Sequence, residues 1–261
     1  MESEIIVNIR NPGEVFACMG FLEIGEIISG NLKCKFDWDQ IPNVFKIDSP
    51  DNKNIFEEVL KYIINAEITG YTPINGIYPA KEFKKEEQPC ILKTAEIKIT
   101  FGQWSEGFRN RPRLKHFAGR QHSLSIAQSL QKKIKKLWNE KIANNPFDPV
   151  IDIDKKSWRL DAKTNWNKLD MGYSLYDEGH TIATSPITEF LAAIGLENTR
   201  PMKEKELTFK YRIWNEYIPP TLSRAIMSCS LPNIGIPYRT FSFEQIEQKN
   251  YKQTSYAKEV I

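Results

Sequence analysis

The side chains with the clearest chemical potential lie in residues 107–139, a segment with nine Lys or Arg residues and no Asp or Glu. The rest of the chain has 27 basic and 33 acidic residues, so a segment of net charge +9 belongs to a body of net charge −6. Cations without a local acidic partner repel one another unless an anion neutralises them. The segment therefore predicts binding to a phosphate-rich ligand, with nucleic acid as the leading candidate.

Two parts of this segment are expected to contact nucleic acid in different ways. A guanidinium group offers a planar fork that can bind phosphate or guanine. Lysines along a helix are instead expected to contact mainly the charged phosphates of the nucleic-acid backbone. The predicted loop contacts are Arg109, Arg111, Arg113, Lys115, Arg120 and Gln121, and the predicted helix contacts are Lys132, Lys133, Lys135 and Lys136. The rings expected to stack on bases are Trp104, Phe108, His116 and Phe117. The plainer interpretation is that the lysines form an ordinary solvated helix face.

Two histidines add a catalytic alternative to simple binding. RNA cleavage without a metal needs a general acid, a general base and cations for the developing charge, and His116 and His122 lie among arginines. The structural alternative is that His116 packs inside its loop and His122 hydrogen-bonds near the start of the helix. Asp161 and Asp170 have no spacing that marks a two-metal site, and we interpret them as turn and surface groups.

Metal and cofactor motifs are sparse in this sequence. The four cysteines, at positions 18, 34, 90 and 229, are scattered singly, which supports neither a disulfide framework nor a zinc-binding pair. The chain has three histidines and lacks the GxxxxGK[ST], GxGxxG, GxSxG and HExxH motifs. We therefore expect no metal and no cofactor.

The elements that must position the basic segment alternate irregularly between strand and helix patterns. In the first half we predict a strand at residues 4–9, a helix capped by Asn11, a hairpin of residues 32–38 and 44–47, a helix capped by Asp51, an extended loop to residue 89, a strand at 91–101 and a helix of about 18 residues that begins near Ser123. An apolar stripe at helical spacing supports the last of these helices.

The second half has a similar irregular order. We predict paired strands at residues 158–162 and 169–174, a helix after Ser185, a strand at 206–214, a helix from Pro219, a strand within 232–243 and a loose tail beyond residue 244. The pattern indicates an α+β fold, with mixed, mostly antiparallel sheet segments and packed helices in a single interlocked unit of residues 1–261.

The two halves also share a short echo. The heptapeptide FLAAIGL at residues 190–196 resembles VFACMGF at 15–21, at a separation of 175 residues. This similarity suggests a weak internal repeat, with halves 1–142 and 143–261. The sequence has no window of 18 uninterrupted apolar residues and no secretory signal pattern, so we expect a cytoplasmic protein without a membrane partner.

Several phrases together carry a family resemblance. They are NPGEVFACMGFLEIGE, LKHFAGRQHSLSIAQSL, WRLDAKTNWNKLDMGYSLYDEG, SPITEFLAAIGLENTRP, YRIWNEYIPPTLSRAI and PYRTFSF. In this order they resemble the short large-subunit-like family of type I-G CRISPR systems, formerly called type I-U. The resemblance spans nearly the whole chain.

The resemblance implies a non-catalytic subunit of an RNA-guided surveillance (Cascade) ribonucleoprotein complex in antiviral defence. The implied partners are guide RNA, target double-stranded DNA and other Cascade subunits, with recognition of a short motif beside the target. Recruitment of a helicase-nuclease is a further implied role, although no C-terminal stretch is typical of the four-helix bundle found in several large subunits. The alternative function is a metal-independent, guide-RNA-processing ribonuclease that uses His116 and His122.

Overall fold

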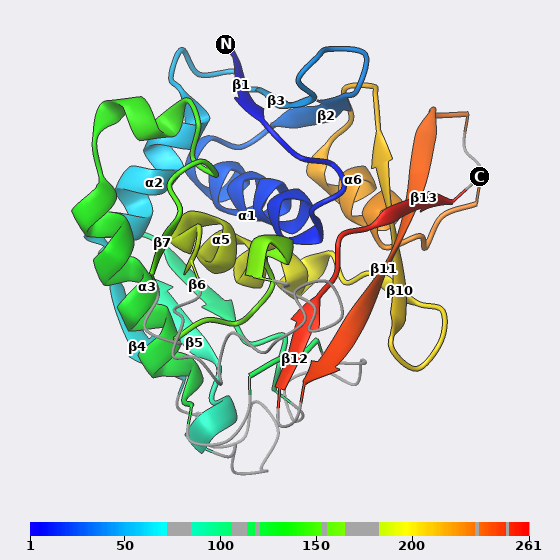
Figure 1. Cartoon of the computed structure of the whole chain (residues 1–261). Coiled ribbons are helices and arrows are strands. Elements are labelled where there is room, and N and C mark those ends of the chain that lie inside the picture. The colour runs from blue at the N-terminus through cyan, green and yellow to red at the C-terminus, as the bar shows by residue number, and fades with distance from the viewer. Residues whose placement is uncertain are drawn as a thin grey trace, which may run out of the picture.

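Two largely buried helices, α1 (Pro12–Ser29) and α5 (Pro186–Asn198), form the centre of the fold, and the other elements surround them (Figure 1). Each helix begins with a capping side chain followed by proline. The side chains of Asn11 and Ser185 each accept a backbone N–H of the first turn, at 3.1 and 3.3 Å. Proline suits the first helical position because the missing N–H has no helical partner there. Both predicted helix starts are confirmed.

The computed structural model describes residues 1–71, 85–105, 114–117, 121–152, 156–164, 183–232, 235–248 and 251–260. Within these ranges the buried apolar side chains form one cluster that extends from Ile5 to Ala257. All pairings between the described strands are antiparallel. The fold is therefore α+β, with antiparallel sheets and packed helices, as the sequence predicts.

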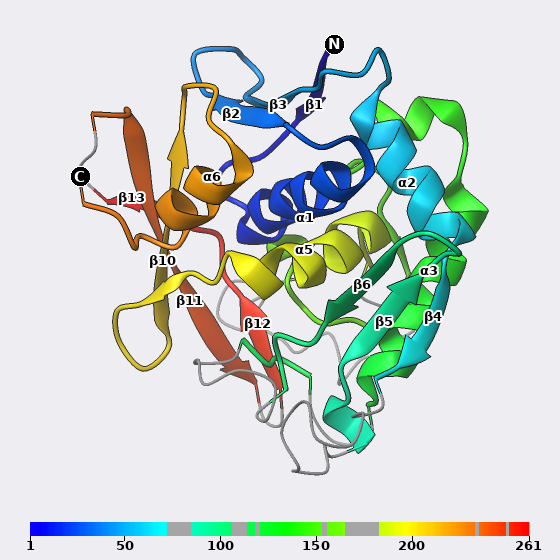
Figure 2. The same cartoon turned by 180° about the vertical axis from the view of Figure 1, so that it is seen from behind.

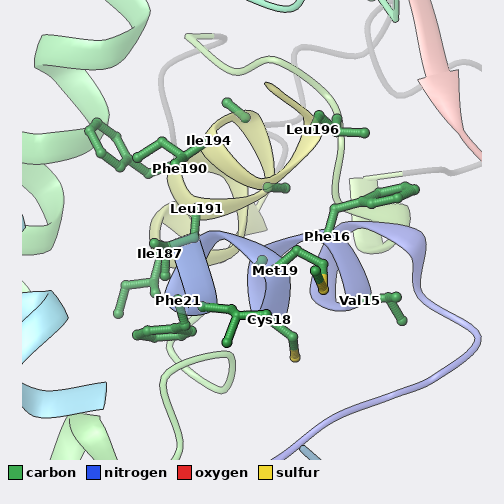
Figure 3. Packing of buried hydrophobic residues seen from close by; sticks show 14 of the residues in the cluster. Val15, Phe16, Cys18, Met19, Phe21, Ile187, Phe190, Leu191, Ile194 and Leu196 are labelled. Carbon is green, nitrogen blue, oxygen red and sulfur yellow. The ribbon is translucent and has the colours of Figure 1, made fainter. Parts of the chain in front are cut away.

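The two central helices approach each other more closely than ordinary side chains permit. A Cβ added to Gly20 would lie 2.2 Å from the carbonyl oxygen of Leu191, and one added to Gly195 would lie 2.0 Å from that of Phe16. Apolar side chains from both helices, among them Phe16 and Leu191, pack around this approach (Figure 3). The contact is reciprocal, because Leu191 and Gly195 follow Phe16 and Gly20 by the same 175 residues. The echo between the two halves therefore lies where the halves meet.

The N-terminal sheet covers α1 at one end of the molecule. Its strands have the order β1-β3-β2, and α2 follows them. Their bounds are β1 Glu2–Ile6, β2 Lys33–Asp37, β3 Val44–Asp48 and α2 Ile55–Asn65. The predicted hairpin of β2 and β3 is confirmed.

A second sheet and helix α3 lie on one side of the central pair, as Figure 2 shows from behind. The sheet has the order β4-β5-β6. The bounds here are β4 Glu67–Gly70, η1 Lys85–Glu87, β5 Cys90–Lys93, β6 Lys98–Phe101, α3 Ser123–Leu137 and η2 Glu140–Ala143. Helix α3 confirms the predicted basic helix and its start at Ser123.

The C-terminal sheet lies on the opposite side of the central pair (Figure 1). It has the order β12-β11-β10-β9, with β13 also paired to β11. The remaining bounds are β7 Ile151–Asp152, η3 Ala162–Thr164, β8 Ala183–Thr184, β9 Met202–Lys203, β10 Thr208–Trp214, α6 Pro220–Met227, β11 Tyr238–Gln248, β12 Tyr251–Thr254 and β13 Lys258–Val260. The predicted strand at 206–214 and the helix from Pro219 are confirmed.

Five local predictions need correction. The extended loop predicted up to residue 89 contains β4 and η1. Helix α2 is capped by Asn54 and not by Asp51. The predicted strand at 91–101 is two paired strands, because a tight turn joins β5 to β6. Residues 158–161 form no strand, and their predicted partner at 169–174 lies outside the described residues. The tail beyond residue 244 contributes to β11, β12 and β13. In the described parts of the chain, each helix is too short or too polar to cross a membrane.

Candidate nucleic-acid interface

Helix α3 is fixed to the body of the protein by its apolar face and by two glutamines. Ile126 and Leu130 are fully buried in the core. The Gln131 amide donates to the carbonyl oxygens of Ile63 and Ala66, each at 2.7 Å, and so binds the last turn of α2. A further donor, Gln128 Nε2, lies 3.2 Å from the carbonyl oxygen of Ile68 on β4. The opposite face of α3 is therefore presented to solvent in a fixed orientation.

The solvent face of α3 carries the predicted helix lysines. Lys132, Lys135 and Lys136 are exposed, and no acidic side chain of the described residues pairs with them. Lys133 is half-buried and donates to the carbonyl oxygen of Asp152. Residues four apart lie about 6 Å from each other along a helix axis, so Lys132 and Lys136 form a short row of positive charge.

A groove of about 360 Å³ runs beside this row. Its lining residues are Ser125, Gln128, Ser129, Lys132, Lys133, Lys136 and Lys156. Lys156 comes from a different part of the chain and adds an exposed ammonium group to the lysines of α3. We call this set the α3 groove. Ser125 and Ser129 have the same helical spacing as Lys132 and Lys136, so the sequence could have placed them on the same face of the helix. Nothing in the sequence indicated that Lys156 joins them.

The predicted loop contacts are placed only in part. Arg109, Arg111, Arg113, Arg120 and Phe108 lie outside the described residues.

The two described loop contacts lie partly inside the protein. Lys115 forms an ion pair with Glu87 at 2.5 Å and lies 5.2 Å from the centre of the Phe117 ring. Its positive charge therefore has an acidic partner, which differs from the expectation drawn from residues 107–139 alone. Gln121 is half-buried.

The described rings that were expected to stack on bases are in the hydrophobic core. Trp104 is 0 % exposed, and His116 and Phe117 are each 2 % exposed. Trp104 stacks on the Trp158 ring with 5.1 Å between ring centroids. A ring covered on both faces by protein has no surface for a base, so base stacking by these residues does not fit the structure.

His116 is also poorly placed for proton transfer to a substrate. Its Nε2 lies 2.8 Å from Nε2 of Gln245, and its carbonyl oxygen accepts from the Lys252 N–H at 3.0 Å. Burial lowers the pKa of His116 to about 3, and the positive charges of Lys252 and Arg159 act in the same direction. The ring is therefore neutral near neutral pH and holds residues 114–117 against the C-terminal sheet. His122 is the N-cap residue of α3 and is half-buried.

The segment that supplies Lys156 is held by a buried polar cluster at the starts of α1 and α5. Asp161 is 0 % exposed. Its carboxylate accepts from the Asn11 amide at 2.7 Å and from the Thr184 hydroxyl at 2.7 Å. Glu189 accepts the backbone N–H groups of Leu160 and Asp161 at 3.0 and 2.9 Å. The sequence interpretation of Asp161 as a surface group is therefore wrong.

The same cluster contains carboxyl groups with raised pKa values. Burial raises the pKa of Glu189 to about 7, and the charge of Asp161 adds to this effect. Burial also raises the pKa of Glu14, although its ion pair with Lys163 at 2.9 Å opposes the shift. Each carboxylate has hydrogen-bond donors from neighbouring segments, which is typical of a structural network. Its role here is to fix residues 156–164, and with them Lys156, onto the central helices.

The described residues contain no group of three or more His, Cys, Asp or Glu side chains that could hold a metal ion. The chain matches no protein-family model, and comparisons with curated proteins and with solved structures find no match either.

Proposed function

We propose that this protein is a non-catalytic nucleic-acid-binding subunit of a type I CRISPR RNA-guided surveillance complex in the cytoplasm. The observation that supports binding most directly is the α3 groove, where Lys132 and Lys136, which have no acidic partner among the described residues, meet Lys156 from another segment. The family resemblance of the sequence supports the assignment to a surveillance complex. The proposed partners are guide RNA, target double-stranded DNA and other subunits of the complex.

The chemistry of the α3 groove favours the sugar-phosphate backbone as the ligand. Lysine ammonium groups and serine hydroxyls donate hydrogen bonds, and such groups contact phosphate oxygens without reading sequence. The described part of the groove contains no exposed aromatic ring and no arginine that would favour a particular base. The groove is therefore proposed to hold a nucleic-acid strand, while base pairing with a guide reads its sequence.

Charge neutralisation in the α3 groove gives the first prediction. Binding of the protein to duplex or single-stranded nucleic acid should give a slope of roughly −3 to −5 in log K against log salt. Replacing Lys132, Lys136 and Lys156 together by glutamine should make this slope less negative by roughly one for each lysine, on motif-bearing and scrambled duplexes alike. Fluorescence anisotropy at a series of salt concentrations measures both effects.

The matched control replaces Lys203 and Lys205, two exposed lysines at and beside β9 in the C-terminal sheet, by glutamine. This variant lowers the net charge by two, against three for the groove variant, and leaves the α3 groove intact, so its slope should stay near that of the unmodified protein. A salt-independent affinity, or equal effects of the groove and control variants, would contradict the proposal.

The absence of catalysis is a separate prediction. Purified protein should leave precursor guide RNA and target duplex uncut, with and without Mg²⁺ or Mn²⁺, because His116 is buried and neutral. Gel analysis of labelled substrates is the measurement. The informative variant is His122→Ala, because His122 is half-buried and makes no side-chain capping hydrogen bond at the start of α3. Cleavage that His122→Ala abolishes while the fold is retained would favour the ribonuclease alternative.

A further inference from the structure

Among the strands that the structure describes, none pairs with one of the two edges of β1. The N-terminal sheet has the order β1-β3-β2. The far edge of β2 is covered, because Cys34 and Ile218 exchange backbone hydrogen bonds of 3.0 and 3.2 Å. At the other end of the sheet, β1 pairs with β3 alone among the strands that the structure describes. A strand edge of this kind presents backbone donors and acceptors to another chain.

The direction of each backbone group on β1 follows from the register. The Val7 N–H donates to Asn43 at 2.9 Å, and Ser49 donates to the carbonyl oxygen of Met1 at 3.1 Å. In an antiparallel pair the groups of successive residues alternate between the two edges. The odd-numbered residues of β1 therefore bond to β3. The N–H and C=O groups of Glu2, Glu4 and Ile6 point to the free edge.

The order of elements explains why this edge is open. The N-terminal part follows the order β1-α1-β2-β3-α2-β4, which is the order of a ferredoxin-like β-α-β-β-α-β unit. In such a unit the fourth strand pairs with the first. Here β4 pairs with β5 in the second sheet instead. The position beside β1 is thus the place of a fourth strand that this chain directs elsewhere.

A groove of about 360 Å³ lies along β1. Its lining consists of Glu4, Ile5 and Ile6 of β1, Gln40, Pro42 and Val44 at and before the start of β3, and Asn144 and Asn145 after η2. Ile6 is 42 % exposed. The groove therefore offers an exposed apolar side chain and carboxamides beside β1.

The charged side chains along the open edge of β1 indicate what kind of segment could bind there. Glu2 and Glu4 have side chains about half exposed, at 49 and 48 %, although both also contact Lys46. A second copy of β1 in antiparallel pairing would place like charges near one another across the edge, which disfavours self-association. A basic side chain opposite Glu4 would be attracted instead.

We propose that β1 receives an extended segment of a different protein chain by β-strand addition, antiparallel to β1. This segment carries basic side chains opposite Glu4 and Glu2 and an apolar side chain opposite Ile6. Backbone hydrogen bonds supply the attachment and the alternate side chains supply the specificity. This binding site is separate from the α3 groove and does not depend on nucleic acid.

The test uses the peptide Val-Thr-Lys-Thr-Lys, whose Val and Lys residues would lie opposite Ile6, Glu4 and Glu2. Two methylated forms provide matched controls with unchanged charge. N-methylation of the Lys residues removes donors that face β1, whereas N-methylation of the Thr residues alters groups that face away. The Lys-methylated form should bind about thirtyfold more weakly than the Thr-methylated form, since it loses two hydrogen bonds of about 1 kcal/mol each. Fluorescence anisotropy with the full chain measures the difference.

Protein variants test the same edge from the other side. Glu4→Pro removes a backbone donor that faces away from β3, so no bond within the sheet is lost, and binding of the unmodified peptide should weaken by about fivefold. Glu4→Gln keeps that donor and should weaken binding less. Equal binding of the two methylated peptides would overturn the proposal, whatever the folding of the variants. Self-association of the unmodified protein that Glu4→Pro abolishes would also overturn it, in favour of a second copy.

Discussion

Replacing Gly20 by alanine is expected to destabilise the protein by about 3 kcal/mol, a large part of the 5 to 15 kcal/mol typical of a folded domain. The new Cβ would lie 2.2 Å from the carbonyl oxygen of Leu191, and neither helix backbone can yield without moving α1 away from α5. This cost outweighs the gain of about 1 kcal/mol in helix propensity. Urea unfolding monitored by circular dichroism measures the change.

Gly25 in the same helix provides the matched control. A Cβ there would meet Cγ1 of Ile55 at 2.9 Å and Cδ1 of Leu32 at 3.0 Å, which are side-chain atoms and not the backbone of a facing helix. Gly25→Ala should therefore change the free energy of unfolding by less than about 1 kcal/mol. Equal decreases in the free energy of unfolding for Gly20→Ala and Gly25→Ala would show that α1 and α5 can accommodate a methyl group at their closest approach.

The double variant Gly20→Ala, Gly195→Ala should cost less than the sum of the two single variants. Both added methyl groups push the same two helices apart, so the first substitution already makes part of the room that the second needs. A strictly additive loss would indicate that the two contacts relax independently.

The second large effect concerns pH. Because the pKa of His116 is about 3 in the folded protein and 6.5 in the unfolded chain, its contribution to stability is present above pH 6.5 and is lost as the pH falls. The loss is roughly 1.4 kcal/mol per pH unit between about 6.5 and 3. His116→Gln removes this titration, so the free-energy difference between the two proteins should shrink by about 2 kcal/mol from pH 6.5 to 5.

The difference between the two proteins is the required measurement, because Glu189 acts in the opposite direction. Its pKa is raised from 4.5 to about 7 in the folded state, so its proton stabilises the fold below pH 4.5, and this contribution is lost as the pH rises through 7. The unmodified protein alone can therefore show a flat pH profile. Urea unfolding at constant ionic strength separates the two groups. A difference that does not vary with pH would mean that His116 is accessible to solvent.

Elements with local signals were predictable from the sequence. Asn11 and Ser185 cap their helices next to a proline, and the strand at β10 alternates cleanly between buried and half-exposed residues. Where two local signals competed, the choice was wrong. Asp51 and Asn54 are both good capping residues, and only the packing of α2 decides between them. The turn between β5 and β6 contains neither glycine nor proline, so nothing in the sequence interrupted the predicted strand.

Features that depend on distant contacts were not predictable. Asp161 is buried because its hydrogen-bond partners, Asn11 and Thr184, come from the starts of two different helices. His116 is neutral because the core buries it, and its hydrogen-bond partner Gln245 lies 129 residues away along the chain. The lysines of α3 were found by helical spacing, whereas Lys156 joins them only through tertiary structure. The lysines of α3 could thus be predicted from the sequence as an anion-binding surface, whereas the presence of Lys156 beside them could be found only from the fold.

The reciprocal contact between α1 and α5 has a consequence for the origin of the chain. Gly20 meets Leu191 while Gly195 meets Phe16, and contacts that exchange in this way are what a two-fold axis generates between identical subunits. An ancestral unit with one such helix would form a homodimer through the same surface. Joining two units in one polypeptide would replace a concentration-dependent association by an intramolecular one, and each half would then be free to diverge. In such a history, the basic helix α3 in one half and the long β11 strand in the other would be differences of that kind.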